Sequence, residues 1–339
     1  MSEPITDVRD LSRIAYGFMA SQALFAALGV GVFDQLAGGP RSTAELAAAT
    51  SIPANRLSAL LNALASVGLV AVGPAGYANA PVVQEFLVRG APRYFGDYLR
   101  VINGRYVYPR MADLEAALRG DADAGRLYAR FMGDPRAAAE FSEAQHKGSL
   151  GPAALVARRV DFAGRRRLLD VGGGSGAITI ALCRRWPELT ATILDFPHTL
   201  PVAQRYVAEA QLEARISHLG GDALEVAWPA DQDVILMSYL WSAVGGPGID
   251  VLVERAARAS APGGLVLIHD FMVDPASGHP AIAAWHLLIS TIGNLEAACL
   301  TVADVTARLE RAGFDPVSAG DLVPGITSLV VARRRAGPT

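Results

Sequence analysis

The sequence predicts an α/β fold in which a mostly helical N-terminal domain precedes a doubly wound parallel sheet. Three observations carry this prediction. Short apolar runs alternate with helical segments from about residue 165 onward, a glycine-rich loop follows the first of these runs, and the first 150 residues are mostly helical in pattern. A chain of 339 residues with 51% hydrophobic residues is long enough for two domains. We place their boundary after residue 150, giving domains 1–150 and 151–339.

Charge and cysteine content exclude several classes of function. Thirty Lys and Arg residues against 33 Asp and Glu residues give a net charge of -3, so no strong global field attracts nucleic acid or acidic membranes. Cys183 and Cys299 are too few for a disulfide framework or a thiolate zinc site. The acidic N-terminal segment lacks the apolar run of a secretory signal. We therefore expect a cytosolic protein without a nucleic-acid or membrane partner.

An uncharged stretch over residues 14–33 tests that expectation, because its length suffices to span a bilayer. Ser21, Gln22 and the glycines at 29 and 31 argue against a span. They indicate a helix of about 15 residues that ends before a turn. A helix that is apolar on nearly all sides needs burial in a core or a subunit interface, and we favour burial over a membrane span.

Two helices and a hairpin are expected next. Ser42 and Glu45 have the spacing of a capping box that starts one helix, and a second helix with leucines on one face ends at Gly68. Two short strands follow, and the whole order is typical of a winged helix. Between residues 51 and 68 only Arg56 is basic, which favours a structural or dimerisation module over DNA binding. Further helices are expected over 94–118 and 136–149.

The C-terminal half reads as strands separated by helices. The strand-like runs are LLDV, TATILD, ISHLGG, DVILMSY, GGLVLIHDF and SLVVARR. The first runs into Gly172-Gly173-Gly174-Ser175-Gly176 and then into a helix from Ala177. Such a loop lets backbone amides approach a nucleotide closely, as in Rossmann-like folds. Gly172, Gly174 and Ala177 also satisfy a relaxed dinucleotide fingerprint, so a nicotinamide-dependent dehydrogenase is one alternative.

Carboxylates at successive strand ends distinguish between nucleotides. Asp170 directly precedes the glycines, Asp195 ends the second strand, where an acid binds ribose hydroxyls, and Asp222 follows the third. Three acids suit a nucleoside that carries positive charge better than one that carries phosphates. We therefore expect S-adenosylmethionine, with Phe196 beside the adenine. Helix capping by Asp195 and Asp222 is the structural alternative.

Several motifs resemble one known family. LLDVGGGSG, LDFPHTLPVAQ, GGDAL and the APGG at Ala261–Gly264 are similar to S-adenosylmethionine-dependent small-molecule methyltransferases of the plant and bacterial O-methyltransferase type. The resemblance covers almost the whole chain. It implies a class I methyltransferase sheet, a homodimer with interlocking N-terminal helices, and methyl transfer to a small, aromatic specialised metabolite. Cofactor contacts are expected from Asp170, Gly172, Gly174, Asp195, Phe196, Asp222 and Ser238.

The acceptor side departs from the family pattern. Counting back from the APGG motif puts Ser242 where the family has its catalytic histidine, and serine is no base near neutral pH. The family's two orienting acids fall on Asp270 and Cys299. The segment Leu240–Ala243 instead resembles the bacteriochlorophyllide C-methyltransferase branch. Oxygen, carbon and nitrogen acceptors are all consistent with this pattern, and so is a relative that binds the cofactor but catalyses hydroxylation, decarboxylation or rearrangement.

The candidates for proton transfer are His286, His269 and His146, with Asp270 as orienting acid. The same bacteriochlorophyllide branch has histidines that match His286 and His146. A hydrogen-bonded core position, a loop cap or a domain contact is the alternative for each of the four. His269, Asp270 and His286 also form a conceivable metal set, but no metal-binding spacing is present, and we expect no metal. The candidates for an aromatic-accepting pocket, with core packing as their alternative, are Trp241, Ser242, Trp285, Tyr108 and Met111.

Overall fold

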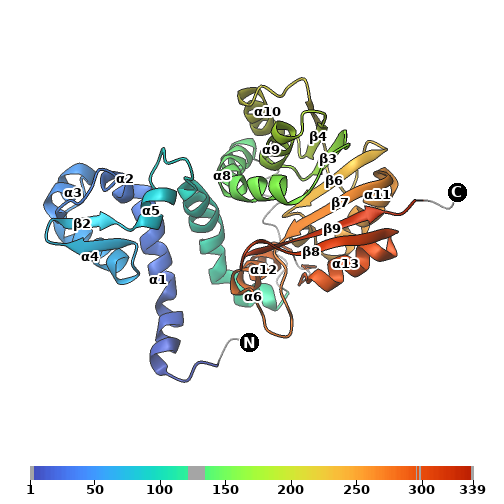
Figure 1. Ribbon diagram of the computed structural model, residues 1–339. Coiled ribbons are helices and arrows are strands. Elements are labelled where there is room, and N and C mark those ends of the chain that lie inside the picture. Colours follow the sequence, from blue (N-terminus) through green and yellow to red (C-terminus); the bar gives the residue numbers. More distant parts are fainter. Residues whose placement is uncertain (1–3, 121–133, 295, 298, 337–339) are drawn as a thin grey trace. The chain divides into compact units, whose positions relative to one another are not determined.

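The computed structural model describes residues 4–120, 134–294, 296–297 and 299–336 (Figure 1). It forms two compact units, Ser2–Pro109 and Arg110–Thr339. The functional boundary that we place after residue 150 falls inside helix α8 (Pro135–Arg159), which packs with the sheet unit, and it stays a prediction.

The first unit begins with a long helix, α1 (Val8–Val30), that is 23 residues long rather than about 15. The Asp7 side chain caps its first turn, and Gly31 ends it in the left-handed conformation. The predicted helix was too short because the charged residues before residue 14 are helical as well. Only Ala23, Ala27 and Leu28 of this helix are buried within the chain. Among the described residues, α1 is the one helix long and apolar enough to cross a bilayer by length and composition.

The winged-helix order is confirmed. Ser42 and Glu45 form the predicted capping box at the start of α3. The core of the unit gathers the leucines of α4 against the end of α1. The elements after α1 are α2 (Val32–Gln35), α3 (Thr43–Thr50), α4 (Ala54–Ser66), the antiparallel strands β1 (Val70–Gly73) and β2 (Gly76–Asn79), and α5 (Pro81–Phe86).

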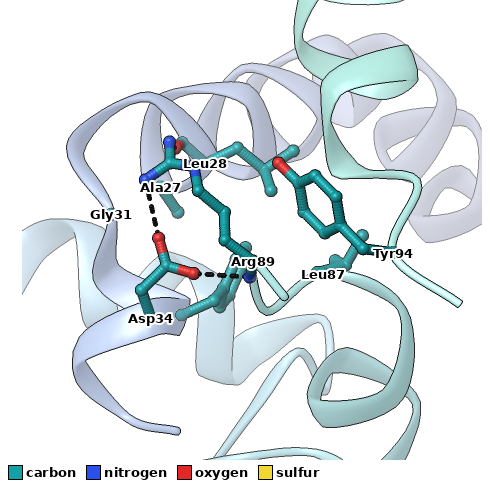
Figure 2. Close-up of a pocket in the computed structure, with 8 residues that line it drawn as sticks. Ala27, Leu28, Gly31, Asp34, Leu87, Arg89 and Tyr94 are labelled. Carbon is teal, nitrogen blue, oxygen red and sulfur yellow. Dashed lines mark hydrogen bonds and ion pairs between the residues drawn. The ribbon is translucent and has the colours of Figure 1, made fainter. Parts of the chain in front are cut away.

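A shallow notch in this unit lies between the end of α1 and the segment after α5 (Figure 2). The guanidinium of Arg89 lies 2.7 Å from Asp34 and donates to the carbonyl of Leu28 at 3.1 Å. Its backbone amide donates to the other oxygen of Asp34 at 2.8 Å. The charged groups that face the notch are therefore partnered with each other, and they tie α2 to the chain after α5.

The helices predicted over 94–118 and 136–149 differ from the observed ones. The first region holds a π-helical segment (Tyr98–Val107), a 3-10 segment (Tyr108–Asp113) and α6 (Leu114–Leu118). Helix α8 continues to Arg159 through Pro152. Buried Ala153 and Val156 pack there against the sheet, and this tertiary contact outweighs the local break that Gly151-Pro152 signals.

The second unit is built on a seven-stranded sheet in the order β5-β4-β3-β6-β7-β9-β8. Five strands are parallel: β3 (Arg167–Val171), β4 (Thr190–Asp195), β5 (Ile216–Gly220), β6 (Gln232–Ser238) and β7 (Ser260–Asp270). The predicted doubly wound sheet is confirmed and is mostly parallel, but at one edge β8 (Phe314–Val323) and β9 (Thr327–Arg334) form an antiparallel hairpin. Strand β8 was missed because Pro316 and Gly320 interrupt its pattern and five consecutive residues, 315–319, are exposed.

Helices cover both faces of this sheet (Figure 1). On one face lie α8, α9 (Ala177–Arg185) and α10 (Leu200–Glu209), and on the other α11 (Trp241–Ala259) and α13 (Val302–Arg311). Helix α12 (Ala281–Gly293) follows the end of β7. The strand order reverses direction between β3 and β6, and open α/β sheets bind ligands at the carboxyl ends of the strands at such a point.

Candidate functional site

The glycine loop lies at this switch point and connects β3 to α9. A Cβ atom on Gly173 would lie 2.8 Å from the carboxyl carbon of Asp170, so a larger residue there displaces the loop. Gly174 has a φ of +56° and no atom within 4 Å of the space where a Cβ would point. The loop therefore presents backbone, packed on one side and open on the other, to a ligand above the strand ends.

Asp195 at the end of β4 holds this loop by its carboxylate. One oxygen accepts the amide of Gly174 at 2.7 Å, and the other accepts the amide of Phe196 at 2.7 Å. Burial raises the pKa of Asp195, while the two amides oppose that shift. Asp222, after β5, accepts the amide of Leu224 at 2.8 Å and is half-exposed. Each acid thus shapes its own turn and keeps acceptor capacity for ligand hydroxyls.

Asp170 is buried beneath the loop and accepts the hydroxyl of Thr179 at 2.5 Å. Burial and, to a smaller extent, the nearby Asp195 carboxylate raise the pKa of Asp170 to about 7, against the opposing effect of the Thr179 hydroxyl. A cationic ligand would offset the cost of ionising this acid, whereas a phosphate would add to it. The Asp170–Asp195 arrangement therefore fits a positively charged nucleoside.

The raised pKa of Asp170 predicts a pH-dependent loss of stability. Because the folded-state pKa lies above the ordinary 3.8, this group stabilises the fold below pH 4, and that stabilisation is lost as the pH rises through about 7. We therefore expect the unfolding free energy of Asp170→Asn minus that of wild type, measured by urea titration, to increase by about 2–4 kcal/mol when the pH is raised from 4.5 to 7.5. Asp233→Asn, at the start of β6 rather than at a strand end, is the control for replacing a carboxylate by an amide in the same sheet. A pH-independent difference for Asp170→Asn would contradict the prediction.

His269 joins three strands in the middle of the sheet edge. Its Nδ1 lies 2.8 Å from the hydroxyl of Ser238, where β6 ends, and its Nε2 lies 2.9 Å from the hydroxyl of Thr327, where β9 begins. The imidazole is fully buried, and burial lowers its pKa to about 3, so the ring is neutral at neutral pH. Both ring nitrogens are engaged by hydroxyl groups. The Tyr239 ring packs edge-to-face with the imidazole, with 4.5 Å between the ring centroids.

Asp270 and Ser242 meet at the start of α11. The amide of Ser242 donates to Asp270 at 3.1 Å, and the amide of Phe271 donates to the other oxygen at 2.8 Å. Burial raises the pKa of Asp270 to about 6, against the effect of the Ser242 hydroxyl and the nearby amides. The two positions that the family resemblance assigns to a base and its orienting acid are therefore in contact, but the base position holds a hydroxyl.

His286 lies on α12 and stacks on Phe271, with 3.6 Å between ring centroids and 18° between ring planes. Burial lowers its pKa to about 4. Phe271 belongs to a small apolar cluster with Val273, Ala283 and Leu287. Within the described residues, His286 donates or accepts no hydrogen bond, so it differs from His269 in having an imidazole held by stacking alone.

The other predicted residues take varied positions. Trp241 is fully buried, and its indole donates to the sulfur of Met237 at 3.4 Å, so it packs in the core. Trp285 is 65% exposed. Tyr108 belongs to the N-terminal unit, where its ring meets Phe25, and Met111 is half-buried. Within the described part of the chain, no three His, Cys, Asp or Glu side chains form a cluster able to hold a metal.

Sequence reasoning missed three hydroxyl partners: Thr179 on Asp170, Thr327 on His269 and Ser175 on His146. The last of these contacts is 2.8 Å long and places His146 beside the glycine loop. These partners cannot be recognised from the sequence, because threonine and serine are equally common at the protein surface, where they have no such role. Only the pairing of distant strands and helices identifies them.

Comparison with known proteins agrees with this geometry. Residues 119–315 match an O-methyltransferase domain, and residues 12–89 match an O-methyltransferase dimerisation domain. The chain is 31% identical over 316 residues to a 3-hydroxy-5-methyl-1-naphthoate 3-O-methyltransferase from Streptomyces sahachiroi, covering 91% of this chain and 89% of that protein. It is 28% identical over 318 residues to the N,N-dimethyltransferase OxyT from Streptomyces rimosus, covering 92% of each chain.

The fold has close counterparts among solved structures. Human N-acetylserotonin methyltransferase in complex with SAM has a TM-score of 0.84 at 24% identity, with 99% of this chain and 100% of that chain covered. The dimerisation-domain match covers residues 12–89 and therefore includes most of α1, the helix whose apolar side chains are largely exposed within one chain. The chain thus belongs to the O-methyltransferase family and is an S-adenosylmethionine-dependent methyltransferase that acts on small molecules as a homodimer.

Proposed function

We propose that this enzyme methylates an aromatic specialised metabolite whose nucleophilic atom needs no proton removal by the protein. Such acceptors include an acidic phenol or enol that is ionised in solution, a free amine, and an electron-rich ring carbon. The observation that carries the proposal is the Ser242–Asp270 contact, which fills the base position with a hydroxyl that cannot accept a proton near neutral pH.

The remaining candidate bases support this proposal. His269 has both ring nitrogens within 2.9 Å of hydroxyls, so we assign it a positioning role for Ser238. His146 has its Nδ1 engaged by Ser175. His286 keeps its nitrogens uncommitted among the described residues, but burial lowers its pKa to about 4, which makes it a poor base. We propose that His286 orients the acceptor beside Phe271.

The cofactor contacts that we propose follow from the loop geometry. The open side of the loop backbone around Gly172 and Gly174 faces the amino-acid end of S-adenosylmethionine. Asp195 and Asp222 bind the ribose and the polar groups next to it, with Phe196 beside the adenine. Asp170 balances the positive charge, and Ser238 lines the crevice. When bound, this cofactor supplies an electrophilic methyl group on sulfur. The protein aligns the acceptor with that methyl group and excludes water.

The relatives suggest acceptors for a test. One relative is named for a hydroxynaphthoate and the other for N,N-dimethylation, so the panel should contain hydroxynaphthoates of graded acidity and an aromatic amine. Formation of S-adenosylhomocysteine is the readout. For acceptors that turn over, the pH at half-maximal kcat/KM should follow the acceptor's own pKa. His286→Ala should keep kcat within about tenfold of wild type, because it removes no proton-transfer step.

Two outcomes would contradict the proposal. One is an inflection at the same pH for every acceptor, which would reveal a base in the enzyme. The other is a loss of roughly a thousandfold in kcat for His286→Ala with unchanged cofactor affinity. Binding of the cofactor without any S-adenosylhomocysteine release across the panel would favour the non-methylating alternative.

We also propose a cytosolic enzyme that binds neither nucleic acid nor membrane. The winged-helix element carries few basic residues, with Arg56 alone in the helix α4 (Ala54–Ser66). The apolar face of α1 is proposed as the part of the dimerisation domain that a second copy covers. Salt-dependent binding of the intact protein to duplex DNA or to anionic vesicles would contradict the proposal that it binds neither nucleic acid nor membrane.

A further inference from the structure

A buried polar contact connects the glycine loop to the outer helices of the sheet unit. His146, in the middle of α8, lies with its Nδ1 2.8 Å from the hydroxyl of Ser175. His146 is 8% exposed and Ser175 is 5% exposed, so water does not compete for this contact. Ser175 comes directly before the last glycine of the loop and is the one residue of Gly172–Gly176 with a polar side chain.

The imidazole is fixed from its other side as well. Its ring stacks on Tyr206 of α10, with 3.6 Å between centroids and 5° between planes. The guanidinium of Arg205 lies 4.4 Å from the Tyr206 ring and pairs with Glu143 of α8 at 2.8 Å. Burial, with Lys147 and Arg205 nearby, lowers the pKa of His146 to about 4, so the ring is neutral at neutral pH. The ring therefore presents Nδ1 to Ser175 in one orientation.

The glycine loop needs such a support. Gly172, Gly174 and Gly176 have φ values of +67°, +56° and +75°, and glycine has the largest backbone freedom to lose when a conformation is fixed. A hydrogen bond at Ser175 reduces the number of loop conformations before the ligand arrives, so less entropy is lost on binding. The bond joins the loop to two helices that pack on the sheet.

We infer that His146 is a positioning residue that holds the glycine loop in its cofactor-binding conformation through Ser175. This inference rests on the proposed cofactor contacts of the loop. It assigns no proton transfer to His146, and it makes Ser175 the residue through which α8 acts on cofactor affinity.

Calorimetric titration of the intact protein with S-adenosylhomocysteine tests this inference. His146→Phe keeps a ring against Tyr206 and removes the nitrogen, and Ser175→Ala removes the hydroxyl. Each variant should bind S-adenosylhomocysteine roughly five- to tenfold more weakly than wild type, as expected for loss of one buried hydrogen bond. The double variant should bind no more weakly than either single variant, because both remove the same contact.

Two further variants separate positioning from general loss of structure. His146→Asn keeps a polar atom near the position of Nδ1 and should restore most of the affinity. Tyr206→Phe keeps the stacked ring and should bind like wild type. In steady-state assays, His146→Phe should raise the KM for S-adenosylmethionine and leave kcat at saturation within about twofold. Melting temperatures of all variants identify any that do not fold.

The outcomes distinguish this inference from the proposed function. If wild type binds S-adenosylhomocysteine and Ser175→Ala binds it equally well, the inference is wrong and the proposed function stands. Additive losses in the double variant would also overturn it, since the two side chains would then act separately. If His146→Phe does not fold, Ser175→Ala and His146→Asn decide the question. If wild type itself does not bind S-adenosylhomocysteine, the proposed cofactor contacts of the glycine loop are wrong, and the inference that rests on them is wrong as well.

Discussion

Asp195→Asn should weaken S-adenosylhomocysteine binding by about 100-fold, which corresponds to about 3 kcal/mol. Both carboxylate oxygens of Asp195 accept a backbone amide at 2.7 Å, one from Gly174 and one from Phe196. An asparagine has one oxygen only, so its NH₂ group must face one of these two N–H donors. The substitution therefore sets an NH₂ group against one amide of the loop, and it removes the negative charge that we propose for binding the ribose hydroxyls.

Asp233→Asn is the matched control for this prediction. Asp233 also accepts two backbone amides, those of Arg166 and Arg167 at 2.8 and 2.9 Å, but it lies where β3 and β6 begin rather than where they end. Calorimetry should show unchanged affinity for Asp233→Asn even if its melting temperature falls. Equal weakening of binding by the two variants would show that the effect comes from stability, and wild-type affinity in Asp195→Asn would remove Asp195 from the site.

Ile14→Asp combined with Phe18→Asp should convert the dimer to a monomer at micromolar concentration. Ile14 is 68% exposed and Phe18 is 50% exposed within one chain, and with Leu11 they follow the helical spacing of one face of α1. Burying two carboxylates in an apolar interface costs several kcal/mol, which raises the dissociation constant by roughly a thousandfold or more. Light scattering coupled to size-exclusion chromatography measures the mass directly.

Val72→Asp provides the control for the interface. Val72 is 65% exposed and lies on β1, outside α1 but in the same unit. The Val72 variant should remain dimeric with an unchanged circular dichroism spectrum. A dimer that persists in the double α1 variant would place the interface elsewhere, whereas a monomer that has lost helix content would indicate unfolding rather than dissociation.

The sequence indicated the sheet and its ligand edge because local patterns carry them. Asp170, the glycine loop and Asp195 are close in sequence to strand ends, and parallel strands bring their carboxyl ends to one edge. The antiparallel β8–β9 edge was not predicted, because Pro316 and exposed polar residues hide the alternation of β8. The length of α1 was underestimated because charged residues in its first turns do not interrupt a helix.

By itself the sequence determined the two-part organisation and the glycine loop with its acids, since both depend on residue type and spacing along the chain. Its resemblance to the methyltransferase family placed Ser242 where that family has a histidine. Only the tertiary structure decided how the histidines are used. His269 is hydrogen-bonded to Ser238 and Thr327. His146 is hydrogen-bonded to Ser175 and stacked on Tyr206, and His286 is stacked on Phe271. The physical reason is that the protonation and orientation of an imidazole depend on burial and on partners from distant strands and helices, and no local pattern encodes those contacts.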